Sequence, residues 1–490
     1  IGAVRGVRFT IQFGLLFRQQ ADQDAGKCAG DKSGNRPDNG HDRVEQGPGD
    51  SDRIDPGLRG RDQEDEVLQA VANLDKFDVP LPQKGCDPET MLEQLDRLGS
   101  PATVASAGGR FFGFVIGGTL PATLAANWLA GAWDQNTGLW AGSPVGSALE
   151  IVSLRWLREL LDLDDAWGGA FVTGATMANF TCLAAARRAL LGVAGWDMEK
   201  DGLYGAPEIT VIAGEDAHAT VFKALGMLGL GRERVIRVPA DAQGRIREKL
   251  VPPVEGPTLL CLQAGNVNSG SFDALRKISE RVRGPQTWIH VDAAFGLWAA
   301  ASSSRRHLVD GLELASSVCT DAHKWLNVPY DSGIALVRCP EALRGAMSFS
   351  TAYLPENERR EPSHYTPELS RRARGVEVWA ALATLGRDGL EELVDRNCRQ
   401  ARRFAQGLAG AGYEILNDVV LNQVLVSFGD DERTQKTIGK IQREGTCWCG
   451  GTRWQGKAAM RISVCSWATT DEDVERSLEA MIRCAASAGD

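Results

Sequence analysis

Short apolar runs alternate with amphipathic stretches between about residues 130 and 338. Each run is bounded by turn residues, as expected for strands that are buried on both faces of a sheet. Stretches with helical spacing, such as 177–191 and 272–283, separate several of the runs. This alternation predicts an α/β domain with a mostly parallel sheet, whose ligands bind beyond the carboxyl ends of the strands. The strand-like runs are "AFVTG", "EITVIAG", "RVIRVP", "TLLCLQAG", "TWIHVDAA", "SSVCTD" and "GIALVR".

The pattern changes after Arg338. A loop rich in charge and proline leads to a long helical stretch, 375–412, and four short strand-like runs follow it with helices between and after them. We expect a smaller α+β domain in this part of the chain. The predicted units are an N-terminal extension (1–65), a helical segment that forms a dimer contact (66–130), a large α/β domain (131–345) and a small α+β domain (346–490).

The N-terminal extension differs from the rest in composition. Between residues 18 and 66 the large aliphatic side chains are Val44, Ile54 and Leu58 alone. Such a segment cannot bury enough apolar surface to offset its ordering entropy, so we expect residues 1–65 to be disordered. The chain opens on an apolar stretch that Arg5 and Arg8 interrupt and that no clear cleavage site follows, which disfavours a signal peptide.

Composition narrows the class of protein. The chain has 490 residues, a hydrophobic content of 43% and a formal charge of −10, which fits a globular protein and disfavours a nucleic-acid partner. Its 11 cysteines are scattered, odd in number and mostly inside apolar runs, as in a cytoplasmic protein with reduced thiols. Cys447 and Cys449 are too close together for the usual zinc spacing, so we expect no metal site.

The longest uncharged stretch, residues 111–133, could span a bilayer by its length. It contains Gly113, Gly117, Pro121 and Asn127, which suit a buried loop followed by a helix. We therefore expect no membrane insertion.

Four short motifs stand at the ends of predicted strands. The first, "VTGATMAN" (172–179), joins a strand to a helix. Its small residues let backbone N–H groups approach a phosphate, and a helix N-terminus favours an anion. Thr176 would add a hydroxyl group. A tight turn with no ligand explains the same residues.

His218 and Asp292 belong to the second and third motifs, "EDAHAT" and "HVDAAFG". His218 is either a capping residue or an aromatic plate against a planar cofactor ring. Asp292 follows a strand that is expected to be buried on both faces, where a carboxylate is costly unless it meets a cation or hydrogen-bond donors. A helix cap or the protonated ring nitrogen of a cofactor would provide them.

Lys324 belongs to the fourth motif, "TDAHKWLNVPYDSG", and follows the strand-like run "SSVCTD". A lysine amine is nucleophilic only when neutral, and burial near other cations favours that form. A surface lysine is the alternative. Together, a phosphate turn, a plate, an acid for a ring nitrogen and a lysine for a Schiff base point to one cofactor, pyridoxal 5′-phosphate (PLP).

These motifs, with "AGNVNSGSFD", resemble those of the group II pyridoxal-dependent decarboxylases, which include aromatic-L-amino-acid and glutamate decarboxylases. The similarity runs from about Glu66 to the C-terminus. It implies the PLP-dependent transferase fold of aspartate aminotransferase (fold type I). It also implies a homodimer with its sites at the subunit interface.

The resemblance assigns roles to residues of this chain. Lys324 would bind the cofactor, Asp292 would hold its ring nitrogen, and His218 and Ala294 would lie on either face of the ring. Arg461 would contact the substrate carboxylate, and Phe114 lies in the region that lines the substrate pocket of relatives. The remaining cofactor contacts would come from Ala175, Thr176, Asp321 and His323 around the phosphate and from Asn266 near the oxygen substituents.

The predicted function is decarboxylation of an L-amino acid to its amine and CO2. The proton that replaces CO2 would come from His218 or from a loop tyrosine, with Tyr365 as our candidate and Tyr353 as another. Aromatic residues between 111 and 140 favour an aromatic substrate if they line the pocket, and core packing is the alternative. A PLP-dependent aminotransferase, another carbon–carbon lyase and a catalytically inactive PLP-binding protein remain alternative functions. Met177 departs from the glutamate of many relatives.

Overall fold

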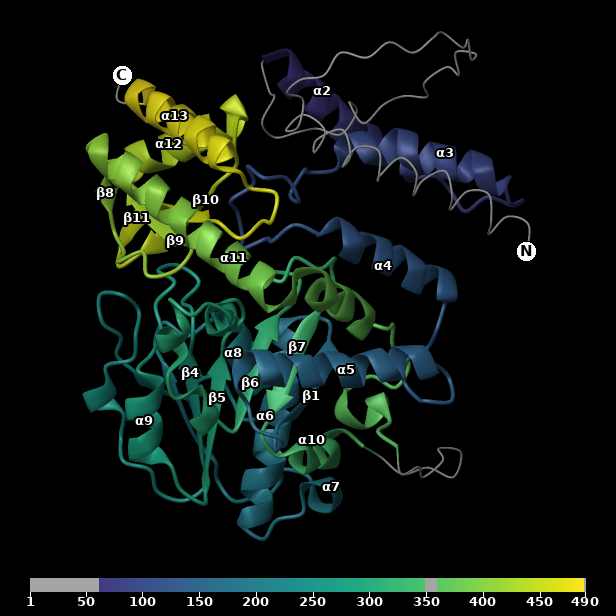
Figure 1. Ribbon diagram of the computed structural model, residues 1–490, viewed down its shortest axis with the longest axis vertical. Helices are drawn as coiled ribbons and strands as arrows, with labels where there is room; N and C mark the ends of the chain where they lie inside the picture. Colours follow the sequence, from purple (N-terminus) through teal and green to yellow (C-terminus); the bar gives the residue numbers. More distant parts are fainter. Residues whose placement is uncertain (1–60, 349–358, 489–490) are drawn as a thin grey trace, which may run out of the picture. The chain divides into compact units, whose positions relative to one another are not determined.

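The computed structural model describes residues 61–348 and 359–488. Most of the predicted N-terminal extension lies outside these ranges, and the first described helix begins at Arg61. Figure 1 shows the arrangement of the elements. The helices are α2 (Arg61–Ala72), α3 (Pro88–Gly99), α4 (Pro121–Trp133), α5 (Pro144–Leu161), α6 (Ala175–Val193), α7 (Met198–Asp201), α8 (Ala219–Met227), α9 (Leu275–Val282), α10 (Pro340–Met347), α11 (Gly375–Gly410), α12 (Asp431–Glu444) and α13 (Asp471–Ser487).

A seven-stranded sheet forms the centre of the larger part, in the order β1-β7-β6-β5-β4-β2-β3. The parallel pairs are β2–β3, β2–β4, β4–β5 and β5–β6, and only β7 runs against its neighbours. All seven strand-like runs of the sequence are strands of this sheet, which confirms the predicted α/β architecture. The strands are β1 (Gly168–Val172), β2 (Thr210–Gly214), β3 (Ile236–Val238), β4 (Thr258–Gln263), β5 (Thr287–Asp292), β6 (Ser317–Asp321) and β7 (Gly333–Val337).

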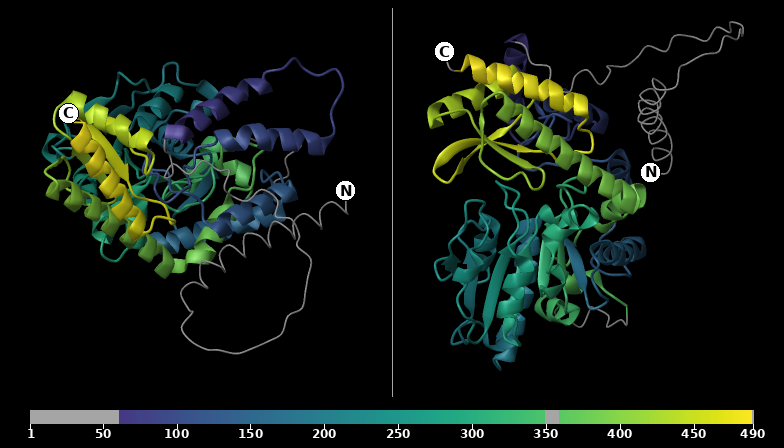
Figure 2. Two further views of the ribbon diagram at one scale, coloured as in Figure 1. Left: turned by 90° about the horizontal axis from the view of Figure 1, so that it is seen from above. Right: turned by 60° about the vertical axis from the view of Figure 1, so that its left-hand side comes forward.

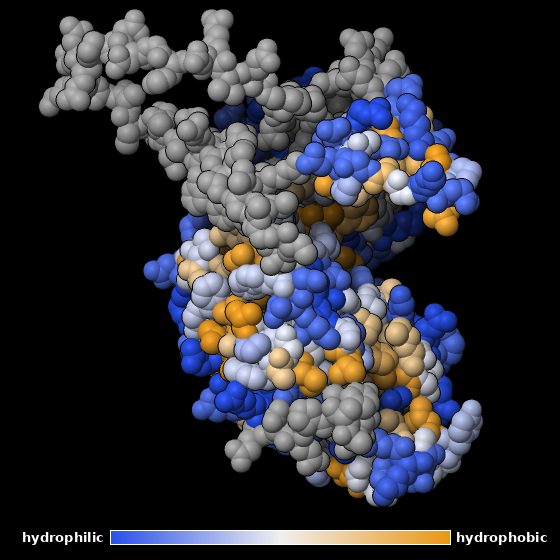
Figure 3. Space-filling view, turned by 90° about the vertical axis from the view of Figure 1, so that its right-hand side faces the viewer, coloured by the Kyte–Doolittle hydropathy of each residue, from blue (hydrophilic) through white to orange (hydrophobic). Residues whose placement is uncertain are grey.

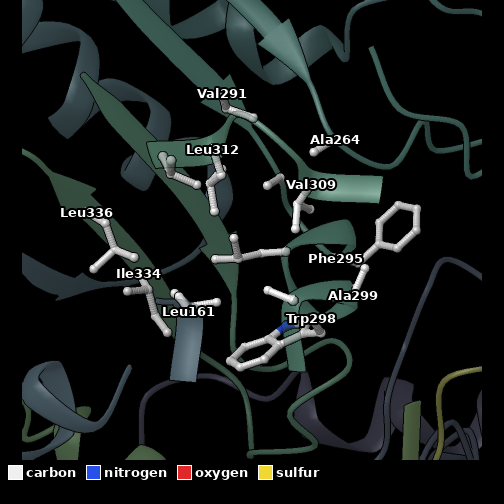
Figure 4. Close-up of a cluster of buried hydrophobic side chains, with 14 of the residues drawn as sticks. Leu161, Ala264, Val291, Phe295, Trp298, Ala299, Val309, Leu312, Ile334 and Leu336 are labelled. Atoms are coloured by element: carbon white, nitrogen blue, oxygen red, sulfur yellow. The ribbon is translucent and has the colours of Figure 1, made fainter. Parts of the chain in front are cut away.

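Two hydrophobic clusters cover the two faces of the sheet. On one face the strands pack against α6, α8 and α10 through residues such as Cys182, Leu225 and Leu343. On the other face α5 and α9 pack against the strands together with the 3-10 helix Gly296–Ala301. Figure 4 shows part of this second cluster, where Leu161 lies near Ile334 and Trp298 lies near Ala299. Burial on both faces explains why the strands read as continuous apolar runs.

A four-stranded antiparallel sheet, in the order β10-β11-β9-β8, forms the smaller part. Its strands are β8 (Glu414–Ile415), β9 (Gln423–Ser427), β10 (Gly450–Trp454) and β11 (Lys457–Ser463). The long helix α11 contacts α4 and α5 of the larger part as well as β9 and α13 of the smaller part. Figure 2 shows α11 passing between the two parts. Its backbone leaves the helical conformation at Gly386, where φ is 60°.

The apolar stretch 111–133 is a loop followed by α4, as the sequence predicts. No helix among the described residues combines the length and the apolar character that crossing a membrane requires. The predicted boundary between residues 345 and 346 falls within α10.

Candidate active site

A cavity of about 290 Å³ lies at the carboxyl ends of β1, β4, β5 and β6. Parallel strands bring side chains from distant parts of the chain together at this edge. Eight residues predicted from the sequence line it: Ala175, Thr176, His218, Asp292, Ala294, Asp321, His323 and Lys324. A larger depression, of about 530 Å³, lies near the amino ends of β4 and β5. Its lining contains no carboxylate, histidine or lysine, so it does not offer the same chemistry.

The N-terminus of α6 forms one end of the cavity. Helix α6 begins directly after β1, and Gly174 occupies the position before its first residue. A side chain at Gly174 would lie 3.2 Å from Cε1 of His323 and 3.4 Å from Oδ1 of Asp321, so glycine permits this close approach. Thr176 lines the cavity beside Ala175. Backbone N–H groups at the start of a helix attract anions, so this end fits a phosphate.

Lys324 lies three residues beyond the end of β6, and its Nζ atom is 2.9 Å from Oδ2 of Asp321. The backbone N–H of Ser332 donates to Nδ1 of His323 at 3.1 Å, so a neutral His323 carries its proton on Nε2. That Nε2 atom lies 3.5 Å from Oδ1 of Asp321, and burial lowers the pKa of His323. The strand end thus presents a lysine, a histidine and an aspartate to the cavity together.

Asp292 ends β5 and is only 3% exposed. Its Oδ2 atom accepts a hydrogen bond from Nδ2 of Asn179 at 3.1 Å, and its Oδ1 atom accepts one from the backbone N–H of Ala294 at 3.2 Å. Among the described residues, no lysine, arginine or histidine forms an ion pair with it. A buried carboxylate with neutral donors and no cation fits the protonated ring nitrogen of PLP.

A chain of hydrogen bonds extends behind Asp292. A carboxylate only accepts, so Asn179 must turn its Nδ2 towards Asp292 and its Oδ1 towards Nε2 of His290, which lies 2.7 Å away. Nε2 of His290 therefore carries the proton, and burial lowers the pKa of His290 to about 4, which keeps the ring neutral. Nδ1 of His290 then accepts from the hydroxyl of Ser317 at 2.9 Å. Ser317 in turn accepts from Nε1 of Trp288 at 2.8 Å.

The sequence analysis did not predict this series of hydrogen bonds, although the sequence contains two signs of it. Asn179 is the last residue of "VTGATMAN", and one turn of helix places it beside the residues at the start of α6. Trp288, His290 and Asp292 alternate along β5, so they lie on one face of the strand. Gln263 is a further cavity residue that was missed, and it pairs with Asp292 across β4 and β5.

His218 combines both roles considered for it. It precedes α8, and its Nδ1 atom accepts from the backbone N–H of Thr220 at 3.3 Å, as a helix cap does. Its ring also lines the cavity. Because Nδ1 is an acceptor, a neutral His218 carries its proton on Nε2. Burial lowers the pKa of His218, which favours the neutral ring.

Arg461 and Asn266 lie next to the cavity rather than on its lining. Nη1 of Arg461 donates to the carbonyl of Val267, a lining residue, at 3.1 Å. No carboxylate among the described residues pairs with Arg461, and burial lowers its pKa. Oδ1 of Asn266 accepts from the backbone N–H groups of Asn268 and Ser269, so that its side chain stabilises its own loop.

Phe114 and Tyr365 are not brought to the cavity within this chain. Phe114 is 61% exposed, and the centre of its ring is 5.1 Å from that of Trp448. Tyr365 packs against the cluster around α6 and α10, with the guanidinium carbon of Arg360 4.2 Å above its ring. Tyr353 lies outside the described residues.

Comparisons with known proteins find similar sequences over most of the chain. Residues 72–429 match the model of the pyridoxal-dependent decarboxylase conserved domain. An aromatic-L-amino-acid decarboxylase of Bacillus atrophaeus is 25% identical over 432 residues, which are 84% of this chain and 88% of that protein. An L-2,4-diaminobutyrate decarboxylase of Rhizobium meliloti is 28% identical over 439 residues, which are 83% of this chain and 84% of that protein.

The fold is similar to that of solved structures. A crystal structure of Catharanthus roseus tryptophan decarboxylase in complex with L-tryptophan superposes with a TM-score of 0.75. The two chains are 18% identical, and the match covers 87% of this chain and 98% of that one. At this identity the likeness describes the fold alone.

Proposed function

This chain belongs to the pyridoxal-dependent decarboxylase family and is an amino-acid decarboxylase that uses PLP; we propose that its substrate is an aromatic L-amino acid. The family also confirms the predicted fold type I architecture. One observation carries the assignment of the site. A single cavity combines a lysine, a buried carboxylate without a cation and the N-terminus of a helix.

In this proposal the lining residues would hold the different parts of PLP. Lys324 would bind the cofactor covalently, and Asp292 would keep a proton on the ring nitrogen. Thr176 and the backbone at the start of α6 would bind the phosphate, with His323 beside them. His218 and Ala294 would contact the ring. When bound, PLP accepts the electron pair that remains as the substrate carboxylate leaves as CO2.

The residues of this chain then handle the substrate and the proton. Arg461 has no acidic partner among the described residues, so its planar guanidinium is available for the substrate carboxylate. His218 borders the cavity with a proton on Nε2, which makes it the described residue best suited to protonate the substrate carbon after CO2 has left. The amide of Asn179 and the backbone N–H of Ala294 donate hydrogen bonds that hold the Asp292 side chain in place.

An aromatic substrate is supported by an aromatic cluster close to Arg461 along the small sheet. The rings of Phe111 and Trp448 stack at 4.9 Å, and Phe114 lies beside them. Trp448 is two residues before Gly450, which is the partner of Arg461 in the β10–β11 pairing. An aromatic side chain next to the carboxylate bound by Arg461 would lie close to these rings.

We also propose a homodimer. Exposed large hydrophobic residues concentrate in the first part of the described chain, for example Leu68, Leu81, Leu95, Phe114 and Ile151. Figure 3 shows a face of the molecule with several such patches. Exposed apolar residues that gather in one part of the chain are typical of a protein interface.

The ten described cysteines are free, and eight of them are buried. Reduced thiols of this kind support the cytoplasm as the compartment.

The experiment is a substrate screen with the purified protein saturated with PLP. L-tryptophan, L-tyrosine, DOPA, L-histidine, L-glutamate and L-2,4-diaminobutyrate are each assayed for CO2 and amine. We expect equal amounts of CO2 and amine, fastest with an aromatic substrate, and no product from Lys324→Ala. A keto acid as the main product would contradict decarboxylation. A fastest reaction with L-2,4-diaminobutyrate or L-glutamate would contradict the aromatic substrate alone.

A further inference from the structure

The side chain of Asp321 contacts two groups that the cofactor would bind. Its Oδ1 atom accepts a hydrogen bond from the backbone N–H of Ala175, the first residue of α6, at 2.5 Å. Its Oδ2 atom pairs with Nζ of Lys324 at 2.9 Å. The side chain is 4% exposed, so water hardly competes for these contacts. Asp321 thus binds the helix N-terminus that would receive the phosphate and the amine that would receive the aldehyde.

We propose that Asp321 competes with the cofactor for its binding site. PLP must displace both contacts of this carboxylate in order to bind. The proposal rests on the function proposed above. It gives Asp321 a role opposite to that of a cofactor ligand, because the residue stabilises the cofactor-free site and weakens the affinity for PLP. A neutral side chain at position 321 would therefore allow the site to bind the phosphate more tightly than the aspartate does.

Electrostatics at the start of α6 favours a single anion there. The N–H of Ala175 is the first backbone donor of α6 inside the cavity, and it cannot serve the Asp321 carboxylate and a phosphate oxygen fully at the same time. Two anions at one helix N-terminus also repel each other in a buried site, where water screens them little. Thr176 remains available to the phosphate, so the competition is partial and the cofactor can still bind.

The contact with Lys324 acts in the same direction. Asp321 pairs with the ammonium form of this lysine, the form that cannot attack an aldehyde. His323 does not relieve the charge of Asp321, because its Nε2 atom is 3.5 Å from Oδ1 and burial lowers the pKa of the ring. The carboxylate therefore depends on the two groups that the cofactor takes from it.

The test compares the binding of PLP and of pyridoxal, which has the aldehyde but no phosphate. Dissociation constants are measured by absorbance titration of cofactor-free wild type, Asp321→Asn and Asp321→Ala. We expect both variants to bind PLP roughly tenfold more tightly than the wild type, because PLP no longer has to displace the two charge-assisted contacts of the Asp321 carboxylate. Pyridoxal should gain less, because it does not use the helix N-terminus.

Asp331→Asn is the matched control. Asp331 lies in the connection between β6 and β7, carries the same charge as Asp321 and pairs with Arg374 at 2.9 Å instead of with the start of α6. Its loss should leave the ratio of the PLP and pyridoxal constants unchanged. Cooperative thermal unfolding of each variant checks that it is folded.

The outcomes separate this inference from the proposed function. Weaker or unchanged PLP binding by a folded Asp321→Asn would overturn the inference, and weaker binding would make Asp321 a ligand of the cofactor. An equal gain for PLP and pyridoxal would refute competition at the helix N-terminus. A wild type that does not form a covalent complex with PLP would instead refute the proposed function.

Discussion

Asp292 and Asp321 end neighbouring strands of the same sheet, and both are almost completely buried. Asp292 meets the amide of Asn179 and a backbone N–H but no cation, whereas Asp321 already has the ammonium of Lys324 and the start of α6. Similar burial therefore leads to opposite chemistry. In the proposed function the cation that meets Asp292 arrives with the cofactor, whereas the protein itself supplies Lys324 as the partner of Asp321.

We expect the largest effect from Asp292→Asn, which tests the difference between the two aspartates directly. The variant keeps the shape of the side chain but offers a neutral amide to the ring nitrogen. We expect kcat to fall by a factor on the order of 1,000, because the lost charge stabilisation acts in a buried site. Steady-state amine formation measures the effect. A visible absorbance band in the PLP-loaded variant shows that Lys324 still binds the cofactor, and a loss of less than tenfold would contradict the role of Asp292.

Asn179→Leu removes the donor to Asp292 and leaves Nε2 of His290 without an acceptor. We expect a loss of activity of roughly 10- to 100-fold and a decrease of about 1 to 3 kcal/mol in the free energy of unfolding. The measurements are kcat/KM and denaturation of the PLP-loaded protein. Asn136→Leu is the control, because Asn136 caps a turn away from the cavity. A stability loss with full activity would make Asn179 purely structural.

The pH dependence of stability tests the chain behind Asp292. Burial lowers the pKa of His290 to about 4, whereas an unfolded histidine titrates near 6.5. Between these values the unfolded chain binds more protons, so folding stability falls as the pH decreases from about 6.5 to about 4. His290→Gln should lose this part of the dependence. Urea denaturation of both proteins across this range measures it, and parallel profiles would contradict the assignment.

The smallest effect is expected at an exposed aspartate outside the site. Asp310 pairs with Arg276 at 2.8 Å on the surface. Asp310→Asn should change kcat/KM by about twofold at most, because solvent screens such pairs and they contribute little. It carries the same change of charge as Asp292→Asn. A large loss of activity in this variant would show that net charge, and not the position of Asp292, controls the reaction.

The architecture could be predicted from the sequence because each strand and each helix is encoded by its own short run of residues. Each strand of the large sheet is a short apolar run, and the motifs with Lys324, Asp292 and Ala175 stand where those runs end. Parallel strands then bring these residues to one edge of the sheet without further information. Their assembly in one cavity therefore follows from the alternation of strands and helices.

Side-chain partners between elements could not be read in the same way. Asn179 and His290 meet because α6 crosses β5 at a particular angle, and no periodicity encodes that angle. Asn266 lies in a matching motif, yet its amide is used by the turn that follows it. Arg461 reaches the region through Val267 from the other sheet, and only the pairing of distant segments places it there.

Lys324 belongs to the large sheet domain and Arg461 to the small sheet, while α11 joins the two parts through a break at Gly386. A substrate held by both residues would therefore bridge the two sheets. Its binding free energy would depend on the separation that the packing of α11 sets between them. Substitutions at the break in α11, far from any reacting atom, should consequently change KM for a short substrate more than the affinity for PLP.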